Sequence, residues 1–151
     1  MSGPDAAQAW FIAGTIPFLL AGGGHALLTV VDTFRPTYFA PDDRSLEPAL
    51  EGTGIRFRRL VPGGDFSRPS MWRAWLGFNI SHGLGVFSFG LLCLLIATEE
   101  FGLVERVAAI PVLAAAVAAT YLLLALRFWF WGPVAITATS TVCFSIAAIL
   151  A

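Results

Sequence analysis

The stretch AWLGFNISHGLGVFSFGLLCLLIAT, residues 74–98, decides the fold because it runs for 25 positions without a charged side chain. An α-helix rises 1.5 Å per residue, so about 20 apolar residues cross the ~30 Å hydrocarbon layer of a membrane. Within hydrocarbon the backbone polar groups must bond inside the chain, which favours a helix. We therefore predict that this stretch is a membrane-spanning helix.

Three further uncharged stretches have a similar length: residues 6–31, 107–126 and 128–151. Together the four stretches predict an all-α integral membrane bundle of four transmembrane helices in a single domain, residues 1–151. The expected spans are about 8–31, 73–98, 106–127 and 132–150, with a long loop at 32–72.

The overall composition excludes several classes of protein. Hydrophobic residues make up 57% of the chain and charged residues 13%, against about 25% charged in soluble domains. A soluble globule and a disordered chain are both excluded by these values. The net charge is −1, and all nine basic residues are arginines. Because there is no excess positive charge to attract phosphates, we expect no nucleic-acid partner.

The distribution of the arginines predicts the orientation. Seven lie between residues 35 and 73 and an eighth is Arg127, whereas Arg106 stands alone on the opposite side. Loops rich in arginine stay in the cytoplasm. The 32–72 loop is therefore predicted to be cytoplasmic, with both termini outside (N-out/C-out). Within this loop the run IRFRRL, residues 55–60, has two interpretations, a membrane-surface segment or a solvated loop.

Aromatic and arginine side chains cluster at the arginine-rich end of the spans. Amphipathic rings and long basic side chains commonly sit at the level of the lipid headgroups. The residues predicted to be such interface anchors are Trp72, Arg73, Trp75, Arg127, Trp129 and Trp131.

Glycines are concentrated in the first two predicted spans. Small residues let membrane helices approach closely, so the first two helices are predicted to be neighbours. The glycines assigned to this packing are Gly22, Gly23, Gly24, Gly77, Gly83, Gly85 and Gly90.

Polar side chains inside the spans are the best functional candidates, because hydrocarbon makes them costly. His25 and His82 are the only two histidines. Each lies about 9–12 Å from the arginine-rich interface, His25 before the end of the first span and His82 after the start of the second. Asn79 is three residues before His82, and Asp32 lies two turns beyond His25. We therefore predict an intramembrane polar site formed by these four residues.

Three interpretations of the histidine pair remain open. The histidines hold helices together by hydrogen bonds, or they form a site for a lipophilic molecule or a proton relay, or they ligate haem or a metal. Two histidines are too few ligands for a zinc site, and the chain has no C-x-x-C-H haem-attachment motif.

The segment MWRAWLGFNISH, residues 71–82, together with Gly24, His25 and Thr29, resembles a family of small, uncharacterised bacterial four-helix integral membrane proteins. The resemblance covers the first two spans and their loop. It implies a multi-pass protein of the bacterial cytoplasmic (inner) membrane and draws attention to Trp72, Trp75, Asn79 and His82. It implies no particular activity or cofactor.

Two classes of function fit these observations. The first is a non-enzymatic binding protein or accessory subunit of a membrane complex, whose partners are the lipid bilayer and the helices of other membrane proteins or of a second copy. The second is a membrane enzyme or carrier for a lipophilic molecule such as a quinone or isoprenoid, acting through His25, Asn79 and His82. No Walker, G-x-S-x-G or H-E-x-x-H motif is present in the sequence.

A labelling experiment tests the orientation. Cysteine introduced by Ser45→Cys is expected to resist an impermeant thiol reagent in intact cells, because the arginines place the long loop in the cytoplasm. Cysteine introduced by Ser2→Cys is expected to react. The reverse pattern would invert the topology, and the native Cys93 and Cys143 are replaced beforehand so that each variant carries a single thiol.

Overall fold

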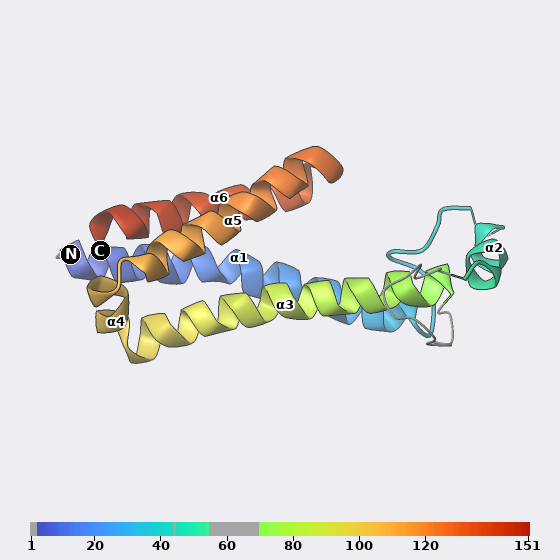
Figure 1. Ribbon diagram of the computed structural model, residues 1–151, viewed down its shortest axis with the longest axis horizontal. Coiled ribbons are helices and arrows are strands. Elements are labelled where there is room, and N and C mark those ends of the chain that lie inside the picture. Colours follow the sequence, from blue (N-terminus) through green and yellow to red (C-terminus); the bar gives the residue numbers. More distant parts are fainter. Residues whose placement is uncertain (1–2, 44, 55–69) are drawn as a thin grey trace, which may run out of the picture. The chain divides into compact units, whose positions relative to one another are not determined.

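The computed structural model describes residues 3–43, 45–54 and 70–151, and these residues form helices and connecting turns without a β-strand. The six helices are α1 (Gly3–Asp32), α2 (Leu46–Gly52), α3 (Met71–Glu99), α4 (Phe101–Arg106), α5 (Ala109–Phe128) and α6 (Trp131–Leu150) (Figure 1). The arginine-containing run at 55–60 lies outside the described residues.

Four of these helices, α1, α3, α5 and α6, are long and apolar enough to cross a membrane. The sequence-based expectation of a multi-pass, all-helical membrane protein is confirmed at this level. The observed helices overlap the four predicted spans, and α1 and α3 run beyond their predicted starts at residues 8 and 73. The short helices α2 and α4 were not expected from the sequence.

The contacts divide the chain into two compact parts. One, called here the bundle unit, contains residues 3–24 and 83–151. The other, called the loop unit, contains residues 25–82. Because the dividing points fall inside α1 and α3, each of these two helices contributes to both units.

An aromatic cluster forms the core of the bundle unit. Phe11 of α1 lies 5.1 Å from Phe144 of α6, and Phe18 of α1 lies 5.3 Å from Phe89 of α3, measured between ring centroids. Tyr121 of α5 meets Phe18 at 5.7 Å. All three pairs are edge-to-face, an arrangement that contributes about 0.5–1.5 kcal/mol per pair beyond area burial. Helix α1 therefore contacts all three other spanning helices through two phenylalanines.

Close backbone approach joins α1 to α3 within the bundle unit. A Cβ atom added to Gly22 would lie 2.9 Å from the carbonyl oxygen of Gly83 and would also meet the backbone of Phe87. A Cβ atom on Gly90 would lie 3.0 Å from Cβ of Phe18. Gln8 adds a direct link, because its side-chain amide donates to the carbonyl of Ala97 at 2.7 Å. The first two spanning helices are thus neighbours at these positions.

Several predicted packing glycines do not take part in this contact. A Cβ atom on Gly24, Gly77 or Gly85 would meet no heavy atom within 4 Å among the described residues, and one on Gly23 would lie 3.3 Å from the ring of Phe87. The prediction that Gly24, Gly77 and Gly85 pack closely against a neighbouring helix is therefore wrong. The physical reason is helical geometry: Gly85 is two residues from buried Gly83, so the two positions face nearly opposite sides of α3.

The glycine contact can be tested with a matched pair of substitutions. Gly22→Ala is expected to lower the free energy of unfolding by about 1–3 kcal/mol, because the new methyl group collides with α3 backbone atoms. Gly85→Ala has open space and is expected to leave stability unchanged or to raise it by up to about 1 kcal/mol through helix propensity. Thermal unfolding in the same detergent compares the two, and equal melting temperatures would contradict the contact.

Candidate functional site

The carboxylate of Asp32 organises the loop unit. Its side chain is fully buried at the C-terminus of α1. Oδ1 accepts the backbone N–H groups of Thr37 and Tyr38, both at 2.9 Å, and Oδ2 accepts that of Phe39 at 2.6 Å. Hydrogen bonds to a charged acceptor are stronger than neutral ones. Three of them fold residues 33–39 back against the helix end.

Phe39 is held in place by this turn and connects three elements. Its carbonyl oxygen accepts the indole N–H of Trp75 on α3 at 3.0 Å. Its ring centroid lies 4.5 Å from that of His25 on α1. Asp32 therefore acts on α3 and on His25 indirectly, through the position of one phenylalanine.

His25 and Asn79 form the polar contact between α1 and α3 in the loop unit. Asn79 is only 2% exposed, and its amide nitrogen donates to the carbonyl of Trp75 at 2.8 Å. The amide oxygen of Asn79 lies 3.0 Å from Nε2 of His25. Because a carbonyl oxygen can only accept, His25 must donate from Nε2, which assigns the hydrogen to that nitrogen. Thr29 adds a bond to the carbonyl of His25 at 2.8 Å.

His82 completes the group from α3. Its ring centroid lies 5.6 Å from that of His25, with the two planes almost perpendicular, and it stacks on Phe78 at 5.9 Å. The structure thus brings together three of the four residues of the predicted polar site. Asp32 is the exception and a correction, because both of its oxygens face the backbone of residues 37–39 rather than the histidines.

The histidine pair does not fit haem ligation in this geometry. Two imidazoles that ligate one haem stand on opposite faces of the macrocycle, whereas these rings contact each other edge to face. Nε2 of His25 is moreover engaged by Asn79. Among the described residues no group of three or more His, Cys, Asp or Glu is positioned to hold a metal ion.

An apolar groove, which was not predicted from the sequence, adjoins the polar group. Its volume is about 340 Å³, within the range of small-molecule sites. The lining residues are Phe39, Ala40, Pro41, Leu50, Met71, Trp72 and Trp75. The available sequence signal was the pair Leu46 and Leu50, spaced i, i+4 within the 32–72 loop.

Two groove residues, Phe39 and Trp75, also belong to the hydrogen-bonded group around His25. The wall of the groove is therefore connected to the polar residues by the hydrogen bond from Asn79 to the carbonyl of Trp75 and by the ring contact between Phe39 and His25. A change in the position of Phe39 or Trp75 would alter both the shape of the groove and the contacts of His25 and Asn79.

The turn before α2 has its own carboxylate. Asp43 accepts the backbone N–H of Ser45 at 2.9 Å. Hydrogen bonds from the hydroxyl and then the backbone of Ser45 hold the pKa of this exposed carboxyl below its usual value.

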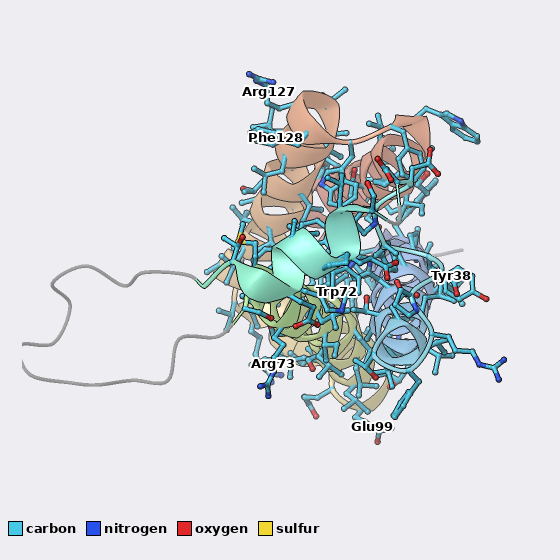
Figure 2. The ribbon with its side chains drawn as sticks, turned by 90° about the vertical axis from the view of Figure 1, so that its right-hand side faces the viewer. Tyr38, Trp72, Arg73, Glu99, Arg127 and Phe128 are labelled. Atoms are coloured by element: carbon cyan, nitrogen blue, oxygen red, sulfur yellow. The ribbon has the colours of Figure 1, made fainter. Side chains whose placement is uncertain are left out.

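The predicted interface anchors fall into two groups. Trp72 is only 8% exposed and packs inside the loop unit. The side chain of Arg73 points outward, as Figure 2 shows, and the rings of Trp75, Trp129 and Trp131 are exposed.

Arg127 is also exposed, and Figure 2 shows its side chain extending away from α5. Its guanidinium carbon lies 5.2 Å from the ring centroid of Phe128. This distance is within the range of a cation–π contact. The side chain therefore covers an adjacent aromatic ring while it keeps its charge at the surface.

Comparison of the chain with protein-family models, with curated proteins and with solved structures found no match.

The role of Asp32 can be tested by Asp32→Asn. The asparagine amide is neutral, and its NH2 group would face at least one of the three backbone N–H groups, so at least one hydrogen bond is lost and none keeps a charged acceptor. The expected decrease in unfolding free energy is about 1.5–3 kcal/mol, with faster hydrogen exchange at residues 37–39. Asp43→Asn is the matched control, because Asp43 is exposed and bonds only within its own turn. Equal effects of the two substitutions would contradict an organising role for Asp32.

Proposed function

We propose that this chain is a non-enzymatic binding protein of a membrane, acting as an accessory subunit, and that the groove of the loop unit is its binding site. The observation that supports this most strongly is the chemistry of the groove. All seven lining side chains are apolar, and none of them is a nucleophile, an acid or a base. Such a surface binds by burial of apolar area.

The polar residues nearby support the same proposal. His25 donates to Asn79, Asn79 donates to the carbonyl of Trp75, and Trp75 donates to the carbonyl of Phe39. The first step joins α1 to α3, the second lies within α3, and the third joins α3 to the turn after α1. Hydrogen bonds between polar residues are a common means of holding membrane helices together. The histidine of α1 thus has a structural task that accounts for its place in a span.

Exposed apolar side chains extend the proposal to lateral partners. In each of the four spanning helices, only 22–33% of the most apolar window is buried inside the chain. The remaining surface is available to lipids and to helices of other membrane proteins. With the arginine distribution and the resemblance noted above, we place the groove at the cytoplasmic side of a bacterial inner membrane.

A second candidate is an enzyme or carrier for a lipophilic molecule, and one observation favours it. The rings of His25 and His82 lie side by side at 5.6 Å, close enough to contact one ligand. This candidate makes the histidines essential for function, whereas the binding proposal makes them dispensable as long as the fold survives.

Photocrosslinking from the groove tests the binding proposal. A diazirine leucine analogue at Leu50, which lines the groove, is expected to give a defined adduct in membranes under ultraviolet light. The same analogue at Leu46, one turn earlier on α2 and outside the groove lining, is the matched control. Identical products from the two positions would contradict binding in the groove.

Histidine substitutions separate the two candidates. His25→Phe and His82→Phe keep a planar ring, so the Leu50 adduct is expected to persist. His25→Phe removes the bond to Asn79 and is expected to lower stability by about 0.6 kcal/mol, the average for hydrogen bonds between membrane helices. Loss of the Leu50 adduct in His82→Phe, with thermal unfolding unchanged, would favour the enzyme or carrier.

A further inference from the structure

The groove continues onto the membrane-facing side of α3. Met71 and Trp75 line it, and together with Phe78 they stand at positions i, i+4 and i+7, which share one face of a helix. These three side chains are 46%, 42% and 63% exposed. A continuous apolar stripe therefore connects the groove with the surface that a spanning helix presents to lipid.

The lengths of α1 and α3 bear on the level at which the groove lies relative to the hydrocarbon layer. Helix α3 has 29 residues and α1 has 30, which corresponds to about 44 and 45 Å of rise. Both exceed the ~30 Å hydrocarbon layer by roughly three turns. Met71, Trp72 and Trp75 belong to the first two turns of α3. Because the uncharged stretch of α3 begins at residue 74, we expect these residues near the boundary between hydrocarbon and headgroups, within reach of lipid tails.

The lining also discriminates between kinds of occupant. A peptide would bring backbone N–H and C=O groups into the groove, and an unpaired polar group costs about 1–3 kcal/mol to bury. The lining side chains are apolar, and the indole N–H of Trp75 already donates to Phe39. A hydrocarbon chain brings no polar group and needs no such partner.

We infer that the groove holds one acyl chain of a bilayer phospholipid, whose glycerol and headgroup remain at the membrane surface. This inference rests on the proposed function, since it names the ligand of the same groove. The acyl chain enters along the Met71–Trp75–Phe78 stripe and ends against Leu50, Pro41 and the ring of Phe39. No covalent step is involved.

Lipid retention tests the inference. The intact protein, gently extracted and washed free of loosely held lipid, is expected to carry one phospholipid in native mass spectrometry. Leu50→Trp fills the groove and is expected to reduce the retained phospholipid at least tenfold. Leu46→Trp, the matched control on the same helix, is expected to retain it within twofold of the unchanged protein. Equal retention by both variants would overturn the inference.

Fluorescence provides a second measurement that does not depend on retention. In a background of Trp10→Phe, Trp129→Phe and Trp131→Phe, the remaining indoles are Trp72 and Trp75, both in the groove lining. A phosphatidylcholine brominated on its chains, added to the delipidated protein in detergent, is expected to quench them saturably at one lipid per chain. Quenching that rises linearly without saturation, or that is unchanged by Leu50→Phe, which narrows the groove without adding an indole, would overturn the inference.

The outcomes also distinguish this inference from the function on which it rests. A protein or isoprenoid adduct at Leu50, with no phospholipid retained, overturns the acyl-chain inference and leaves the binding function intact. No defined adduct at Leu50 and no retained phospholipid overturns both.

Discussion

The loop unit depends on the hydrogen bonds that the buried carboxylate of Asp32 accepts from the backbone of residues 37–39. A negative charge at the C-terminus of a helix is unfavourable, because the helix dipole places partial negative charge there. Backbone N–H groups folded away from water are unfavourable when unpaired. At the end of α1 the two costs cancel, since the carboxylate accepts the N–H groups of residues 37–39. The bend after α1 follows from this pairing, and the position of Phe39 follows from the bend.

The bundle unit and the loop unit are each stabilised internally by a different kind of interaction. Apolar helices gain little from contact with one another in lipid, because lipid tails are equally apolar. The bundle unit therefore relies on shape: edge-to-face rings around Phe18, and close backbone approach at Gly22 and Gly90. The loop unit relies on directed hydrogen bonds, from Asp32 to Phe39 and from His25 to Asn79. Complementary shapes mainly stabilise the bundle unit, and matched donors and acceptors mainly stabilise the loop unit.

The groove and the polar group illustrate how binding and structure share residues. Trp75 presents its ring to the groove, its N–H to Phe39 and its backbone carbonyl to Asn79. A side chain with several fixed partners has little conformational freedom left, so the shape of this wall is fixed by the fold. His25 reaches this wall through the ring of Phe39 and through Asn79, so its contacts help to hold Trp75 and Phe39 in place.

The sequence by itself determined the number and type of the spanning helices, because hydrocarbon imposes one requirement, uncharged length, which is visible residue by residue. It also indicated that His25 and His82 lie at a similar depth, with Asn79 about one turn from His82, since helical rise is uniform. Only the tertiary structure decided which face each residue presents. Helical rotation separates Gly83 from Gly85, buries Trp72 and turns Asp32 toward its own following residues. The groove likewise arises from residues 39–41, 50 and 71–75, which are distant in sequence and are joined by a fold-back that no local pattern encodes.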